Sequence, residues 1–127
     1  MKDLIFILPY QSGTLARLTA ALHDAGIDLQ GCSGQQFGPE GIIHLLVDDA
    51  AAARQAAARA GFVVREEREV LVAGIEDRPG ALAGLLAPLA EAGIDVNLTY
   101  LATESRVVIG VADLERAQAA LRPAAGR

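Results

Sequence analysis

The stretch "LVAGIEDRPGALAGLLAPLAEAGIDVNL" (71–98) decides the fold, because an earlier stretch, "LIFILPYQSGTLARLTAALHDAGIDLQG" (4–31), matches it without a gap. A shift of 67 residues places Gly13 on Gly80 and superposes the two copies of "AGID". Agreement in register over this length indicates an internal repeat. We therefore expect two copies of one structural unit.

The second half of each copy extends the repeat. "IIHLLVDDAAAARQAA" (42–57) corresponds to "RVVIGVADLERAQAAL" (106–121) once the second copy loses three residues in a loop. We expect one unit at 1–68 and the other at 69–127.

Each copy begins with the same two patterns. Short apolar runs (4–8 and 70–75) predict buried strands, and apolar residues at i, i+3, i+4 and i+7 predict amphipathic helices (14–25 and 81–92). Glycines 26 and 93 stand where a glycine commonly ends a helix.

Alternation with a period of two follows each of these helices and predicts a further strand. Apolar residues such as Ile94, Val96, Leu98 and Tyr100 are expected on one face of that strand. The residues expected on the face turned away from the helices are Asp28, Gln30, Cys32, Asp95, Asn97 and Thr99.

The rest of the first unit predicts a strand (42–47), an Ala-rich helix (49–60) and a fourth strand, "FVVRE" (62–66). "REERE" (65–69) indicates a solvated edge where two strands meet. The order βαββαβ is the ferredoxin-like arrangement, an α+β fold in which an antiparallel sheet carries two helices on one face. The second unit ends in "RPAAGR" (122–127), so it lacks a clear fourth strand.

Composition narrows the function. Three Phe, two Tyr and no Trp predict an aliphatic core, and a net charge of −5 disfavours binding to nucleic acid or to an anionic membrane. A single cysteine excludes an intrachain disulfide. The apolar run at the N-terminus is shorter than the ~7–15 residues of a signal peptide or the ~20 of a membrane span, which favours a cytoplasmic protein.

The quoted motifs resemble those of the ACT domain. "EDRPGALAGLL" (76–86), "LAEAGIDVN" (89–97) and a strand pair before "VADLERAQAAL" (111–121) carry the likeness, and over residues 3–122 the chain resembles small bacterial proteins with two ACT units in tandem. This resemblance implies a regulatory module, without catalytic activity or a cofactor, that binds an amino acid or similar small ligand at the interface between units. It also implies a homodimer.

The turn "EDRPG" (76–80) has a physical reason to bind a carboxylate. The first N–H groups of a helix lack partners and carry the positive end of the helix dipole, and a glycine lets a ligand approach the backbone. We expect ligand contacts at Arg78, Pro79, Gly80 and Ala81, with the ligand carboxylate on N–H groups near Gly80, Ala81 and Leu82. The ammonium would need carbonyls or a carboxylate such as Asp95 from a neighbouring strand, and Asn97 is a further expected contact. Pro79 and Gly80 can equally serve only to start a helix that Asp77 caps.

The first unit departs from this pattern, since it has "PYQSG" (9–13) in place of "EDRPG". Gly13 is kept, and Ser12 and Thr14 offer capping hydroxyls. The corresponding site residues are Gln11, Ser12, Gly13, Thr14 and Asp28. The two turns therefore need not bind the same ligand.

Two other functions remain open. The altered "PYQSG" turn favours an assembly module that mediates protein contacts without a ligand. An enzyme would use Cys32 and His44, which could be neighbours on adjacent strands, but two ligands are too few for a metal site and a nucleophile needs further partners. We therefore expect no metal site and interpret this pair as packing and a satisfied polar group.

Overall fold

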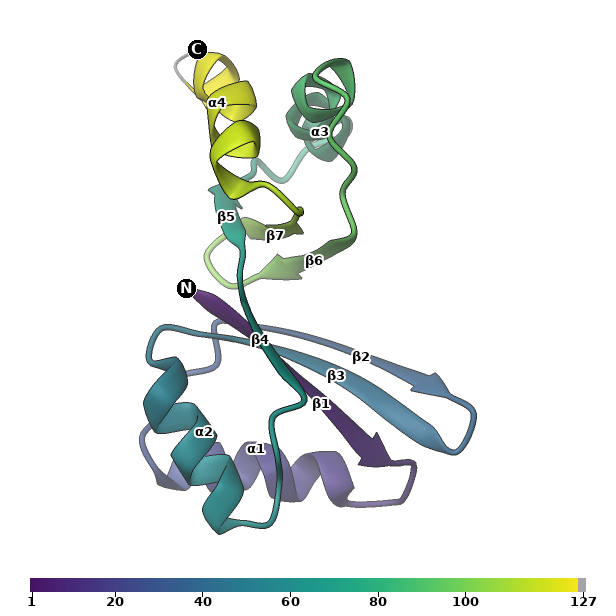
Figure 1. The fold of residues 1–127 in the computed structure, drawn as a ribbon, viewed down its shortest axis with the longest axis vertical. Coiled ribbons are helices and arrows are strands. Elements are labelled where there is room, and N and C mark those ends of the chain that lie inside the picture. Colours follow the sequence, from purple (N-terminus) through teal and green to yellow (C-terminus); the bar gives the residue numbers. More distant parts are fainter. Residues whose placement is uncertain (126–127) are drawn as a thin grey trace. The chain divides into compact units, whose positions relative to one another are not determined.

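A computed structural model describes residues 1–125 of the chain, with side chains to residue 122. The chain divides into two compact units, Met1–Glu69 and Val70–Arg127. Figure 1 shows that the two helices of each unit cover one face of that unit's sheet. None of the helices in the described part is long and apolar enough to cross a membrane.

The first unit has the order β1 (Lys2–Pro9), α1 (Thr14–Asp24), β2 (Gly31–Phe37), β3 (Glu40–Val47), α2 (Ala50–Arg59) and β4 (Glu66–Glu69). Its strands lie in the order β4-β1-β3-β2, and every neighbouring pair is antiparallel. This is the predicted ferredoxin-like topology. Its core is aliphatic apart from Phe6 and Phe62, and the Ala-rich α2 packs closely against it through Ala53 and Ala57.

The second unit repeats this order without the last strand: β5 (Leu71–Gly74), α3 (Ala81–Glu91), β6 (Leu98–Ala102), β7 (Arg106–Gly110) and α4 (Leu114–Ala125). The strand order is β6-β7-β5, again antiparallel. Helix α4 continues to Ala125, so the described part of this unit has no fourth strand, as predicted. Residues 126 and 127 of the "RPAAGR" tail lie outside the described residues.

Equivalent backbone hydrogen bonds recur in the two units. The N–H of Ile27 donates to the carbonyl of Leu22 and that of Ile94 to Leu89, both at 2.9 Å. These bonds close α1 and α3 around left-handed glycines, Gly26 (φ 76°) and Gly93 (φ 71°). The prediction that these two glycines end the helices is confirmed.

The fourth strand of the first unit lies later than predicted. Residues 62–65 of "FVVRE" are irregular, and β4 occupies the charge run instead, with Glu66 opposite Ile5 and Glu69 opposite Lys2 of β1. The reason is that only one edge of β4 is paired within this sheet, so a charged sequence costs little there. The predicted edge is correct, but the predicted strand bounds are wrong.

The faces assigned to the strands that follow α1 and α3 are partly wrong. Ile94 and Val96 pack against the core as predicted, but Thr99 lies opposite Ile109, which belongs to that core. Opposed residues of an antiparallel pair project to one face, so Thr99 lies on the helix-bearing face and Tyr100 on the other. Cys32 lies on the helix-bearing face for the same reason, because it is opposite Leu45.

The physical cause of this change of face is the same in both units. Residues 27–30 and 94–97 are not strands, and regular pairing begins only at Gly31 and Leu98. An irregular segment need not keep the period of two, and a slip of one residue exchanges the faces.

Candidate functional site

The turns that precede α1 and α3 have the same backbone structure. Gly13 (φ 86°) and Gly80 (φ 84°) both adopt the left-handed conformation at the helix N-cap. The N–H of Thr14 donates to the carbonyl of Gln11 (3.4 Å), and the N–H of Ala81 donates to that of Arg78 (3.3 Å). The repeat is therefore preserved in the local geometry of both candidate sites.

Both turns leave helix donors available. Within the described residues, the backbone N–H groups of Leu15 and Ala16 donate no hydrogen bond to another protein group. The same holds for the equivalent N–H groups of Leu82 and Ala83. A Cβ built on Gly13 or Gly80 would meet nothing within 4 Å, so the backbone is open on that side. These N–H groups lie at the positive end of a helix dipole and can bind a small anion.

The predicted caps are not formed. Within the described residues neither helix start is assisted by a side-chain hydrogen bond, so Ser12, Thr14 and Asp77 do not cap these helices. The side chain of Thr14 faces inward at the start of α1, where its hydroxyl oxygen is buried and has no hydrogen-bond partner in the described part of the chain. The glycine conformation, rather than a side chain, shapes each turn.

The two turns differ in side-chain chemistry. In the second unit, the Nε of Arg78 donates to Glu76 at 2.6 Å, and Asp77 is exposed with no partner among the described side chains. In the first unit the equivalent positions are Pro9, Tyr10 and Gln11, which carry no charge. Asp77 can accept an ammonium beside Gly80, whereas the first turn has no carboxylate to do so.

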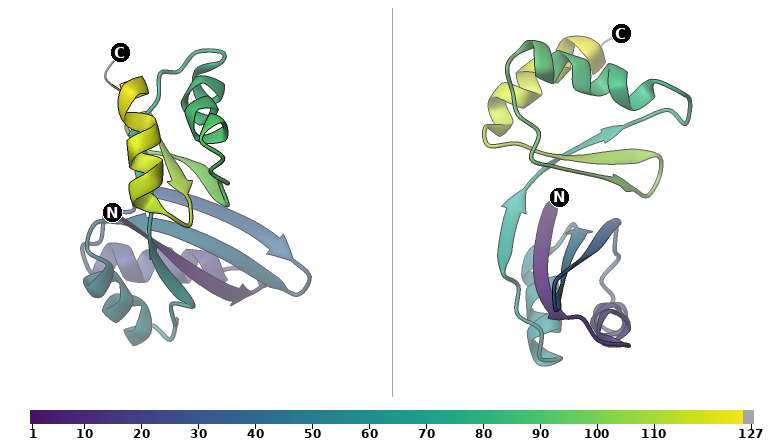
Figure 2. Two further views of the ribbon diagram at one scale, coloured as in Figure 1. Left: turned by 45° about the horizontal axis from the view of Figure 1, so that its top comes forward. Right: turned by 90° about the vertical axis from the view of Figure 1, so that its right-hand side faces the viewer.

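Asp95 lies far from Gly80 within its own unit. Helix α3 separates them, and its eleven residues span about 16 Å at 1.5 Å per residue. Figure 2 (right) shows the turn before α3 and the segment after it at opposite ends of this helix. Asp28 is separated from Gly13 by α1 in the same way.

A small amino acid therefore cannot contact the turn and the following strand start of the same unit. The structure brings Gln11, Ser12, Gly13 and Thr14 together, and likewise Arg78, Pro79, Gly80 and Ala81. Asp28, Asp95 and Asn97 lie at the other ends of the helices.

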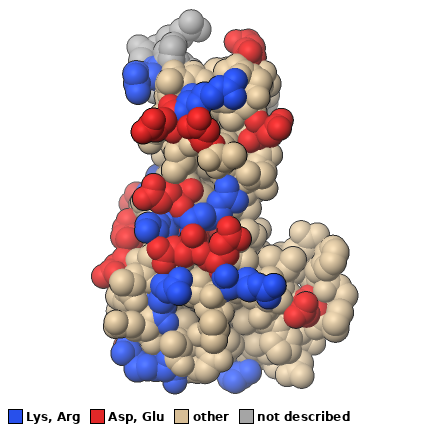
Figure 3. Space-filling view, viewed as in Figure 1, with Lys and Arg blue, Asp and Glu red and all other residues tan. Residues whose placement is uncertain are grey.

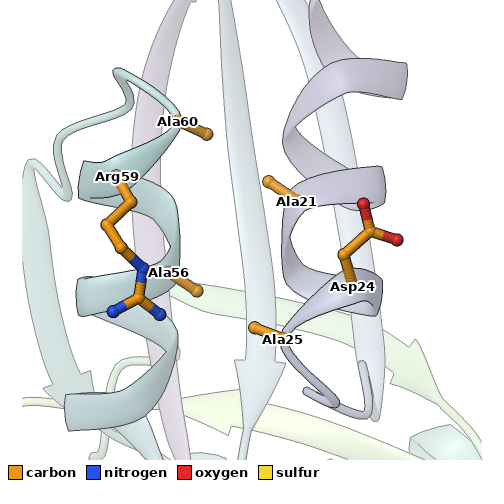
Figure 4. Close-up of a pocket in the computed structure, with 6 residues that line it drawn as sticks. All are labelled: Ala21, Asp24, Ala25, Ala56, Arg59 and Ala60. Atoms are coloured by element: carbon orange, nitrogen blue, oxygen red, sulfur yellow. The ribbon is translucent and has the colours of Figure 1, made fainter.

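The described part of the chain includes two hollows that bear on the site. One, of about 310 Å³, lies between α1 and α2, and Figure 4 shows alanines on both helices with Asp24 and Arg59 on opposite sides. The other, of about 380 Å³, lies beside the C-terminal end of α3. Its lining residues are Leu86, Leu89, Ala90, Gly93, Ile94, Asp95 and Val96.

Cys32 and His44 are not a catalytic pair. His44 is opposite Ser33 in the register, so it lies on the face away from Cys32. Its Nδ1 is 2.8 Å from the Oδ2 of the buried Asp3, and burial raises the pKa of the Cys32 thiol. Among the described residues, no cluster of three or more His, Cys, Asp or Glu could hold a metal ion.

Solved structures share this architecture along nearly the whole chain. Protein BT0572 from Bacteroides thetaiotaomicron is 26% identical, with a TM-score of 0.86 over 98% of this chain and 88% of that one. The ligand-free regulatory subunit of aspartate kinase from Thermus thermophilus is 23% identical, with a TM-score of 0.72 over 98% of this chain and 89% of its own. The corresponding subunit from Thermus flavus is 20% identical, with a TM-score of 0.64 over 98% and 90%.

No protein-family model matches the sequence, and no curated protein matches it significantly. The duplicated α+β topology and these structural neighbours define the chain as a protein with two ACT-like units in tandem. The fold that the sequence resemblance implies is confirmed.

Proposed function

We propose that this tandem ACT-fold chain is a non-catalytic regulatory protein that binds an amino acid at its strand–helix turns. The observation that carries the proposal is the duplicated left-handed glycine, whose open backbone lies beside two helix N–H groups that have no acceptor among the described residues. The aspartate kinase neighbours support it, because the matching chains are regulatory subunits.

The second turn suits a zwitterion. The ligand carboxylate would accept hydrogen bonds from Leu82 and Ala83, and the ammonium would lie against Asp77. Arg78 is already paired with Glu76, so it does not compete for Asp77. The first turn has the same N–H groups but no carboxylate, so it would bind more weakly or take a ligand without an ammonium group.

Isothermal titration calorimetry against the twenty amino acids tests this function. We expect heat of binding for at least one of them and a weaker response in Asp77→Asn. Glu91→Gln is a matched control, because it removes an exposed charge at the other end of α3. If all twenty give no heat with folded protein, the sensor function is wrong.

An assembly module without a ligand is the second candidate. The side chains of Tyr10 and Phe37 favour it, since they are 63% and 71% exposed. These two aromatics would be buried in a homodimer, which we also expect from the sequence. An assembly module would melt at a temperature that rises with protein concentration and is insensitive to amino acids, whereas a sensor would melt later with its ligand.

We propose that either candidate acts in the cytoplasm. Fractionation of cells that express the full-length protein would test this location.

A further inference from the structure

The hollow beside the C-terminal end of α3 has the composition of a ligand pocket. Leu89 and Ile94 are buried at its base, and Leu86 and Val96 are half-buried. Asp95 is the one charged residue in the lining. An apolar pocket with a few polar groups at its mouth is the usual form of a small-molecule site.

Asp95 is available to a cation. Its side chain is exposed and has no hydrogen bond or ion pair among the described residues. The C-terminal end of a helix carries the negative end of the dipole. The last turn of α3 has no basic residue of its own, but the guanidinium of Arg116 donates to the carbonyl of Ala92 there. An ammonium group beside Asp95 would therefore be favoured chiefly by the carboxylate.

Arg116 provides the opposite charge beside Gly93, which lines the hollow. Its Nη2 donates to the carbonyl of Ala92 and lies 3.7 Å from the position of a Cβ built on Gly93. No ion pair joins Arg116 to Asp95 within the described residues. The other guanidinium N–H groups can therefore bind a carboxylate.

The first unit does not keep this combination, although Leu22, Ile27 and Leu29 stand in place of Leu89, Ile94 and Val96. Its equivalents of Leu86 and Arg116 are Thr19 and Ala52. The carboxylate of Asp28, equivalent to Asp95, accepts a hydrogen bond from Gln30 at 2.8 Å. The repeated backbone thus has this combination of aliphatic lining, available carboxylate and guanidinium in the second unit alone.

We propose that this pocket binds an aliphatic α-amino acid, with its side chain against Leu86, Leu89 and Val96, its ammonium at Asp95 and its carboxylate at Arg116. The inference rests on the proposed function for the class of ligand, but it assigns a site at the end of α3 remote from Gly80. It also names the side-chain class, because four aliphatic residues line the space.

Methyl and amide NMR of the full chain during titration with L-leucine tests the proposal. We expect shifts of the Leu86, Leu89, Ile94 and Val96 methyl groups. Asp95→Asn and Arg116→Gln should each weaken binding by about tenfold or more, because each removes a charge-assisted hydrogen bond. Asp28→Asn and Arg17→Gln, which remove charges from the first unit, are the matched controls and should leave the affinity for L-leucine unchanged.

Ligand fragments test the assigned charges. Isopentylamine lacks the carboxylate, so Arg116→Gln should not change its affinity. 4-Methylpentanoate lacks the ammonium, so Asp95→Asn should not change its affinity. Both should bind more weakly than L-leucine. Leu86→Thr, which installs the residue of the first unit, should reduce the preference for L-leucine over L-alanine.

Two results would overturn the proposal that this pocket binds an amino acid. One is the absence of methyl shifts at saturating L-leucine in a folded protein, and the other is shifts that survive both charge substitutions. If L-leucine moves only the Gly80–Ala83 amides, this inference fails while the proposed function stands. If no amino acid gives calorimetric heat but isopentylamine moves the methyl groups in an Asp95-dependent way, the amine pocket exists without the sensor function.

Discussion

Gly13 and Gly80, 67 positions apart in the chain, accept the same hydrogen bond at the start of equivalent helices. The N–H of Arg17 donates to Gly13 at 2.9 Å, and the N–H of Gly84 donates to Gly80 at 3.0 Å. Both glycines hold a φ near 85°, where an L-residue is strained. The duplication is therefore visible as a shared backbone conformation as well as a shared sequence.

Replacing either glycine by alanine is expected to lower the free energy of unfolding by about 1–2 kcal/mol, the cost of a left-handed L-residue. No steric clash adds to this cost, since the space beside both glycines is open. Urea unfolding of Gly13→Ala and Gly80→Ala measures it. A loss below about 0.3 kcal/mol in either variant would show that its turn adopts another conformation.

Gly84→Ala should have the opposite effect. Gly84 lies inside α3, is exposed and has nothing near its Cβ position. Alanine in a helix interior is favoured over glycine by about 1 kcal/mol. A higher urea midpoint is expected for this variant, and an unchanged or lower midpoint would contradict the helical assignment at this position.

The pair of Lys2 and Glu67 predicts a dependence of stability on pH. The hydrogen bond from Lys2, 2.9 Å long, holds the pKa of the Glu67 carboxyl below its ordinary value of 4.5. The stabilisation is therefore complete above pH 4.5 and is lost as the pH falls through the lowered pKa. Lys2 has a raised pKa, so its contribution disappears only in strong alkali.

Glu67→Gln should make the free energy of unfolding less dependent on pH below 4.5. Urea unfolding at several pH values measures this dependence. Glu66→Gln is the control, because Glu66 is exposed and lies on the other face of β4. If both variants lose the same amount of pH dependence, Glu67 is not the source of the acid-dependent loss of stability.

Cys32 should react slowly with alkylating reagents. Cys32 is exposed, but desolvation by its neighbours raises the pKa of its thiol, so less thiolate is present at pH 8 than for a free cysteine. We expect iodoacetamide to react with Cys32 faster in urea than in the folded protein, because the reaction rate follows the thiolate fraction. Alkylation should leave amino-acid binding intact, and loss of binding would reopen a direct role for Cys32.

The repeat made most of the fold predictable. Two copies of "AGID" and the aligned leucines predicted both α1 and α3, and the glycines predicted where they begin and end. Strand β4 was misplaced because "FVVRE" has the stronger β pattern. Partner strands, rather than propensity, decide which segment pairs with β1.

The candidate site was less predictable than the fold. The two turns follow from local sequence, but the separation of Asp95 from Gly80 depends on the direction in which α3 runs across its sheet. Arg116 has no motif around it, and its equivalent is Ala52. Only the packing of α4 against α3 brings its guanidinium to Ala92.

The charged strand β4 affects how the protein behaves in concentrated solution. Its four residues are Glu66, Glu67, Arg68 and Glu69. Figure 3 likewise shows acidic and basic side chains interspersed on the face in view. A second molecule that added a strand to this edge would have to desolvate ionised groups, so β4 disfavours the growth of amyloid-like fibrils from the first sheet.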